Sequence, residues 1–286
     1  MVVALALGGV CSASVAVAVP NAARPGSGSM QAARSSATRT WIVRAGEPVQ
    51  ATIDRAGPGD LVVLRPGTHR EALRITTPGL RIAAVGARLA LSGRVPGPCG
   101  PDRRPAAVCI GGGRPVPGVV LAGLTVTDSA GAGVIADRAP GLVVWGVVVR
   151  RSADDGIVLV DVPGGRVRRV LSRGNRGAGL RMVGAASAGL LIGDSSSVAN
   201  GVGLAFDDAG GVTVESGDLR ANCVGVRADA SRPVIRPVRL VGSVIRDNGR
   251  SCPPPDRGPH GSAIVVGGPA EVRTERTRAV RNAPAG

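Results

Sequence analysis

Five segments of the sequence begin with glycine and then alternate large apolar residues with variable ones, at intervals of 22 to 24 residues. They are GVIADRA from Gly133, GIVLVDV from Gly156, GLRMVGA from Gly179, GLAFDDA from Gly203 and GVRADAS from Gly225. A sixth copy, SAIVVGG, starts at Ser262 after a longer gap, and further strand-like runs lie between the copies. This period, with short strands and no helical pattern, predicts a solenoid whose coils each add strands to parallel sheets. The regular leucine–asparagine spacing of leucine-rich repeats is missing.

The alternation within each copy predicts which side chains face the core. Side chains alternate between the two faces of a strand, so the first and third residues after each glycine should point inward and stack along the solenoid axis. The predicted inward set is Val134, Ala136, Ile157, Leu159, Leu180, Met182, Leu204, Phe206, Val226, Ala228, Ile264 and Val266. The second residues vary freely, which predicts a sheet that is buried on one face only. Asparagine recurs in the turns, at Asn175, Asn200, Asn222 and Asn248.

These repeats resemble those of the right-handed parallel β-helices of the pectin-lyase-like superfamily. The stretch VQATIDRAGPGDLVVLRPGTHREALRI, residues 49–75, looks like the N-terminal segment of that superfamily, with a short helix followed by strands separated by Pro-Gly turns. The resemblance covers about residues 42–282. It implies an all-β, right-handed parallel β-helix of about eight coils with a short N-terminal helix. It is poor evidence for function, because many activities share this scaffold.

The N-terminal residues and the cysteines indicate the cellular compartment of the protein. Residues 1–18 read as a secretory signal peptide, since an apolar run ends in the small-x-small pattern Ala16-Val17-Ala18. Residues 19–40 read as a disordered linker, residues 41–286 as the β-helix domain, and no other run is apolar enough to span a membrane. Four cysteines remain after the signal, which predicts a secreted protein with two disulfides. Neighbouring coils lie within disulfide reach, so Cys223 is expected to pair with Cys252, and Cys99 with Cys109 across a Pro/Gly-rich loop.

The net charge and the aromatic content indicate which kinds of polymer the protein could bind. The formal net charge is +15, and arginine supplies all the basic residues. This favours an anionic polysaccharide as the partner, although a GC-rich genome would also produce an arginine-rich chain. Tyrosine is absent and Phe206, Trp41 and Trp145 are the only aromatic residues, so base stacking and hence nucleic-acid binding are not expected.

Asp154 and Asp155 precede the second copy and are candidate catalytic carboxylates. Sister copies place Gly131-Ala132 and Gly177-Ala178 at these two positions. Asp154 therefore occupies a turn position that we expect to have a positive φ, whereas Asp155 departs from the repeat. A double Asp before such a strand resembles the catalytic pair of polygalacturonases, but the acid one coil earlier and the histidine one coil later are missing. Salt bridges to nearby arginines are the structural alternative.

A second set of candidates lies on the predicted outer face. Asp207 and Asp229 occupy corresponding positions of adjacent coils, with Arg227 on the same strand as Asp229 and Arg181 in its column. This resembles the calcium and arginine arrangement of pectate lyases, so calcium is a candidate cofactor at Asp207 and Asp229. Calcium prefers six to eight oxygen ligands, and solvated edge charges are the alternative. Arg181, Arg227 and His260, which lies in the inserted loop before the sixth copy, are the candidate substrate-binding residues.

Two functions of different class follow. The first is a secreted, non-catalytic interaction module that binds anionic or cell-envelope polysaccharide. The alternative is a lyase, hydrolase or epimerase that acts on a uronate-containing polysaccharide. The repeats also end without a polar cap, and open sheet ends invite self-association at the C-terminal coil.

Overall fold

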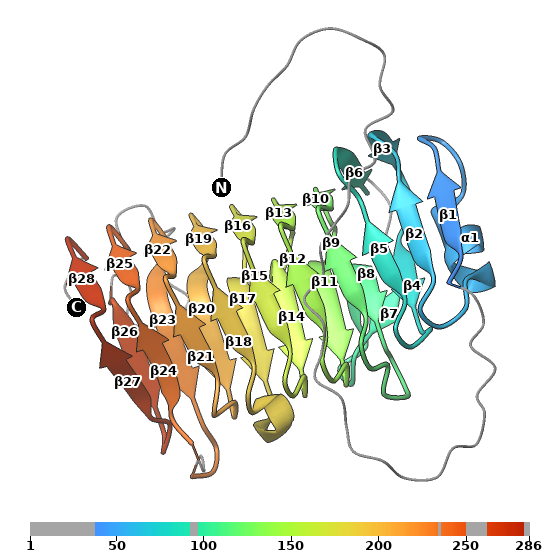
Figure 1. Cartoon of the computed structure of the whole chain (residues 1–286). Helices are drawn as coiled ribbons and strands as arrows, with labels where there is room; N and C mark the ends of the chain where they lie inside the picture. Colours follow the sequence, from blue (N-terminus) through green and yellow to red (C-terminus); the bar gives the residue numbers. More distant parts are fainter. Residues whose placement is uncertain (1–37, 92–96, 234–235, 250–261, 283–286) are drawn as a thin grey trace, which may run out of the picture. The chain divides into compact units, whose positions relative to one another are not determined.

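The computed structural model describes residues 38–91, 97–233, 236–249 and 262–282, which form three parallel sheets wound into a solenoid (Figure 1). Each coil contributes one strand to each sheet in turn. The sheets contain ten, nine and nine strands, so the solenoid has about nine coils against the eight predicted. The right-handed parallel β-helix expected from the repeats is therefore confirmed.

The three sheets are named A, B and C in the order in which each coil enters them. Sheet A contains β1 (Thr40–Val43), β2 (Leu61–Leu64), β5 (Arg81–Ala83), β9 (Val120–Ala122), β12 (Val143–Trp145), β15 (Arg166–Arg168), β18 (Leu191–Gly193), β21 (Thr213–Glu215), β24 (Val238–Val241) and β27 (Val272–Glu275). Sheet B contains β3 (Gly67–His69), β6 (Ala87–Ala90), β10 (Thr125–Thr127), β13 (Val148–Arg150), β16 (Leu171–Arg173), β19 (Ser196–Val198), β22 (Asp218–Arg220), β25 (Val244–Arg246) and β28 (Arg278–Val280). Sheet C contains β4 (Leu73–Ile75), β8 (Arg104–Ile110), β11 (Ala132–Asp137), β14 (Ile157–Val160), β17 (Ala178–Val183), β20 (Val202–Asp207), β23 (Val224–Asp229) and β26 (Ile264–Gly267), with the short β7 (Pro98–Cys99) antiparallel to β8.

The glycine-led repeats form the strands of sheet C, and their register is the predicted one. Val134 pairs with Ile157, Ile157 with Leu180, Leu180 with Leu204 and Leu204 with Val226. These residues are at most 2% exposed and form one column of the core. A one-residue slip would turn this column to the outer face of the sheet, so burial fixes the register.

The glycines that recur in the turn before sheet C, Gly131 and Gly177, have a different cause from the predicted one. Gly131 and Gly177 do not adopt positive φ, and neither does Asp154. A Cβ at Gly131 would instead collide with the carbonyl oxygen of Pro105, and one at Gly177 with the carboxylate of Asp155. The expectation of a left-handed turn was therefore wrong, because close packing against the neighbouring coil is what requires glycine here.

The turn between sheets B and C contains a ladder of buried asparagines. The backbone N–H of Asn175 donates to Oδ1 of Asn200 at 2.9 Å, and that of Asn200 donates to Oδ1 of Asn222 at 2.9 Å. Asn222 continues the ladder to Asn248, and Asn248 to Asn282. The side-chain amides donate along the same direction, so each rung holds the turn of the next coil in register.

The two ends of the solenoid differ. At the N-terminal end, α1 (Val49–Arg55) packs against β1, β2 and β4 and buries Val49 and Ile53 against the core. At the other end, Val266 belongs to an inward column yet is 48% exposed, because no further coil covers it among the described residues. In the part of the chain that the structure describes, no helix is both long and apolar enough to cross a membrane.

Candidate functional site

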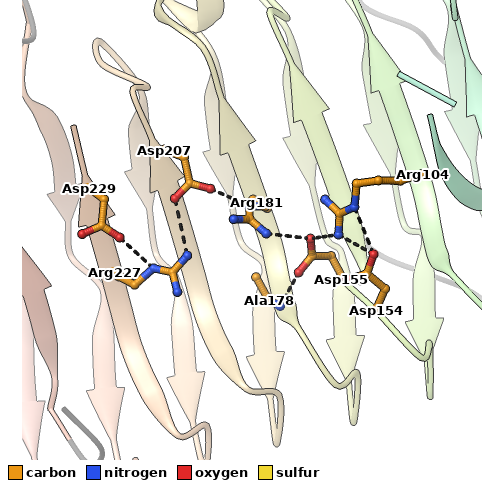
Figure 2. A network of polar contacts seen from close by, with 8 residues as sticks. All are labelled: Arg104, Asp154, Asp155, Ala178, Arg181, Asp207, Arg227 and Asp229. Carbon is orange, nitrogen blue, oxygen red and sulfur yellow. Dashed lines mark hydrogen bonds and ion pairs between the residues drawn. The ribbon is translucent and has the colours of Figure 1, made fainter. Parts of the chain in front are cut away.

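The outer face of sheet C contains a chain of alternating charges whose members come from the coils of β8, β14, β17, β20 and β23 (Figure 2). In order along the solenoid axis, its members are Arg104, Asp154 and Asp155, Arg181, Asp207, Arg227 and Asp229. We call this set the charge ladder. It contains four carboxylates and three guanidinium groups, so it brings together both predicted catalytic aspartates, both predicted metal-binding aspartates and two predicted substrate-binding arginines.

Asp155 lies at the centre of the charge ladder and is almost completely buried, with only 2% of its side chain exposed. Its Oδ1 accepts the backbone N–H of Ala178 at 2.6 Å, and its Oδ2 accepts Nη2 of Arg104 at 2.6 Å. Arg181 approaches the same Oδ2 at 3.4 Å. These three donors come from β8, which lies two coils before β14, and from β17 in the coil after it, so Asp155 joins three coils.

Asp154 has a different environment from its neighbour. Its side chain is 35% exposed, and its Oδ2 accepts Nη2 and Nε of Arg104, the latter at 3.1 Å. Both aspartates therefore bind one nitrogen of one guanidinium. The catalytic carboxylates of glycosidases flank the bond that they cleave, and here Arg104 holds both carboxylates at one nitrogen.

The carboxylates proposed for calcium are also held by arginine. Asp207 and Asp229 are paired in register, but Arg227 lies between them, 3.5 Å from Oδ1 of Asp207 and 2.9 Å from Oδ2 of Asp229. Nε of Arg181 binds the other oxygen of Asp207 at 2.5 Å. Among the described residues, no three His, Cys, Asp or Glu side chains gather where they could hold a metal. Because calcium prefers six to eight oxygens, these residues fit an arginine–carboxylate chain better than a calcium site.

The partly buried guanidinium groups of Arg104 and Arg181 have raised pKa values for a common reason. Burial alone would lower the pKa of Arg104, but its hydrogen bonds to Asp154 and Asp155 outweigh this effect and raise the pKa. The same balance raises the pKa of Arg181, through the charges of Asp207 and Asp155. Both arginines therefore remain cations that can bind only acceptors.

The first part of the outer face of sheet C is covered by its own chain. Cys99 is joined to Cys109 by a disulfide, as predicted, and the segment 97–104 lies over β11 and β14. Ile135 and Val158 point outward from the sheet but are only 1% and 2% exposed, because they pack in a second apolar cluster with Cys99. The predicted one-sided sheet is therefore wrong for β11 and β14, and the pairing of Cys99 with Cys109 was the sequence signal for this cover.

A groove of about 360 Å³ opens beside this cover. Its apolar floor is formed by Ile135, Val158, Val160 and Val183. Its polar rim is formed by Arg104, Asp154, Arg181 and Asp207, and the covering segment contributes Gly100, Pro101 and Asp102. Asp155 does not line the groove. We call this space the sheet C groove.

We expect the Cys99→Ser/Cys109→Ser double variant to lose about 2–3 kcal/mol of unfolding free energy, because the disulfide closes a loop of about ten residues. The covering segment should also detach, so that Ile135 and Val158 become accessible. Denaturant unfolding measures the first effect, and hydrogen exchange at β11 and β14 the second. Reduction of the wild type is not an equivalent test, because a reductant would also open the disulfide of Cys223. Unchanged exchange at β11 would show that side-chain packing alone holds the cover in place.

Two of the other predicted residues cannot be placed. Cys223 takes part in a disulfide, but its predicted partner, Cys252, lies outside the described residues. His260, the third candidate substrate-binding residue, also lies outside them.

The parallel coils, the asparagine ladder and the N-terminal helix define a right-handed parallel β-helix with the fold of the pectin-lyase-like superfamily. No protein-family model and no curated protein matches the sequence. Among solved structures, the chain is similar to pectate lyase Pel9A, with 17% identity, a TM-score of 0.52 and 86% of the chain covered. It is also similar to the periplasmic alginate epimerase AlgG, with 14% identity, a TM-score of 0.51 and 83% covered.

A third similar structure is PfbA, a surface adhesin of Streptococcus pneumoniae, with 10% identity, a TM-score of 0.50 and 76% of the chain covered. The chain spans 64%, 55% and 60% of the length of the lyase, the epimerase and the adhesin, respectively. At these identities the comparisons show a shared fold, and the three neighbours themselves differ in what they do.

Proposed function

We propose that this chain is an exported, non-catalytic module that binds polysaccharide in the sheet C groove. The observation that carries the proposal is the state of Asp155, which is buried and held by three donors instead of lining the groove. The groove offers carboxylates and guanidinium groups at its rim that can bind the hydroxyl or carboxylate groups of a sugar chain, and the partly exposed Val183 at its floor can contact a sugar ring. Neighbours of this fold include proteins that are named for action on pectate and alginate.

The proposal extends to the location and assembly of the protein. A disulfide between Cys99 and Cys109 suits an oxidising compartment, which supports export. At the C-terminal coil, β26, β27 and β28 each have a neighbouring strand on one side only among the described residues. Self-association through these edges is part of the proposal, and light scattering at several protein concentrations would detect it.

The alternative is a lyase, hydrolase or epimerase, and Asp154 is the residue that favours it. Its partly exposed carboxylate lines the groove together with Arg104 and Arg181. An enzyme of this kind would release unsaturated or reducing ends from polygalacturonate or alginate, or would change the ratio of epimers in the polymer. Assays for all three products in the presence of calcium therefore separate the two functions.

We expect Val183→Trp to weaken polysaccharide binding by about tenfold or more, because the indole fills the floor of the groove. Val63→Trp is the matched control, since Val63 is a half-buried valine on the outer face of sheet A. Affinity for polygalacturonate, alginate and a neutral glucan should be measured for both variants. Equal affinities for all three glycans in both variants would rule out the groove as the binding site. Turnover that Asp154→Ala abolishes would establish the enzyme instead.

A further inference from the structure

One coil carries an unusual concentration of uncompensated positive charge. The stretch between Asp161 and Asp194 contains six arginines and no acidic residue. Arg181 belongs to the charge ladder, and Arg168 lies 3.5 Å from both Asp194 and Glu215. The other four are Arg166, Arg169, Arg173 and Arg176, which are exposed and form no ion pair among the described residues. Arg150, on the preceding coil, shares these properties. We call these five residues the arginine belt.

The pairing of Arg150 with Arg173 sets the belt apart from other arginines of the solenoid. Three pairs of arginines lie directly opposite each other on neighbouring strands: Arg150 with Arg173, Arg220 with Arg246, and Arg239 with Arg273. Like charges in this position are destabilising. Asp218 binds both members of the second pair, at 3.3 and 3.4 Å, and Glu275 and Glu271 bind the members of the third. Within the part of the chain described, only the first pair lacks a carboxylate.

The surroundings of the belt fit sugar rings as well as acidic groups. Val148 and Leu171 are paired on the same outer face of sheet B and are partly exposed, one step along the strands from Arg150 and Arg173. At the turn from sheet A to sheet B, Trp145 is 40% exposed and the guanidinium of Arg169 lies 4.9 Å from its ring centroid. Apolar side chains therefore alternate with cations across two adjacent coils.

We infer that the arginine belt is a second binding surface, for an acidic polysaccharide, and that it is separate from the sheet C groove. Carboxylates of a uronate polymer would supply the counter-charges that Arg150 and Arg173 lack, through the paired N–H groups that make arginine suited to carboxylates. The partly exposed apolar residues would contact the sugar rings. Single-stranded nucleic acid is the less suitable polyanion, because Trp145 is the one aromatic side chain near the belt and successive bases need successive stacking partners. The belt does not depend on the proposed function of the groove.

The test compares two double variants on the same sheet. Arg150→Ser/Arg173→Ser and Arg220→Ser/Arg246→Ser each remove two arginines that face each other across neighbouring strands of sheet B. The total charge of the protein therefore falls equally in both. The first variant should bind polygalacturonate about tenfold more weakly than the wild type, and its affinity should depend less on salt because fewer counterions are released. The second should stay within about threefold of the wild type, because Asp218 already neutralises its arginines in part.

Other outcomes of this test would contradict the inference or its assignment of the partner. Equal losses in both variants would mean that the net charge of the chain, and not the belt, attracts the polymer, which would overturn the inference. Preferred binding of single-stranded DNA that the first variant alone loses would overturn the assignment of the partner. A neutral glucan has no carboxylates for the belt, so Val183→Trp should weaken its binding and Arg150→Ser/Arg173→Ser should not, which makes a failure of the groove proposal and a failure of this one distinguishable. Circular dichroism of both double variants must first show an intact β-helix.

Discussion

Asp155→Ala is expected to lower the free energy of unfolding by about 2–4 kcal/mol. The substitution leaves the backbone N–H of Ala178 without its acceptor in a buried turn, and it removes the one carboxylate that contacts both Arg104 and Arg181. The effect is smaller than for a fully buried ion pair, because the two arginines are 23% and 29% exposed and each keeps another aspartate. Chemical denaturation monitored by circular dichroism would measure the loss.

The neighbouring aspartate provides the control for this prediction. Asp154 binds the same guanidinium of Arg104 but is partly exposed and contacts no buried backbone group, so Asp154→Ala should cost less than about 1 kcal/mol. Catalytic groups are often held at a cost in stability, and their removal then stabilises the protein. An Asp155→Ala variant as stable as the wild type, or more stable, would therefore contradict the structural role and return Asp155 to the list of catalytic candidates.

The strands of sheet C could be predicted because buried apolar residues recur in the sequence once in every coil. The inward column that contains Ile157 and Leu180 follows from the alternation of residues after each glycine, and a single register buries all its members. The N-terminal helix was identified by resemblance and lies at the expected place, α1 (Val49–Arg55), whereas Gly67 and Thr68 of the expected Pro-Gly-Thr turn belong to strand β3. The pairing of Cys99 with Cys109 followed from their positions around a Pro/Gly-rich loop.

The candidate site could be predicted only in part, because it depends on contacts between residues far apart in the sequence. The outward positions of Arg181, Asp207 and Arg227 follow from the repeat, and the structure brings them together. The role of Arg104 could not be predicted from the repeat. Arg104 lies about 50 residues before Asp154 and Asp155, on a strand next to the covering segment, and the repeats contain no such segment. For the same reason, the burial of Ile135 and Val158 on the outer face could not be seen in their own repeats.

Asn200→Ala is expected to destabilise the solenoid by about 2–4 kcal/mol, as much as the loss of Asp155. Oδ1 of Asn200 accepts both the backbone N–H and Nδ2 of Asn175 at 2.9 Å. Its Nδ2 donates to Oδ1 of Asn222, to Ser197 and to the carbonyl oxygen of Ser172. Alanine would leave the backbone N–H of Asn175 buried with no acceptor, in a turn that water does not reach because Asn175 and Asn200 are 2% and 3% exposed. Denaturant unfolding and hydrogen exchange at β17 and β20 would report the loss.

The position of a rung along the ladder should decide how far the damage spreads. In a solenoid each coil contacts only its neighbours, so stability is the sum of the coils and of the interfaces between them. Asn248→Ala removes the same kind of rung two coils further on, beside the last described coil, whose inward residues are already exposed. We therefore expect Asn248→Ala to cost about half as much and to raise exchange only in the adjacent strands β23 and β26. If both variants lost the same free energy and exchanged throughout the chain, the solenoid would unfold as a single cooperative unit, and the ladder would act on the whole molecule instead of on adjacent coils.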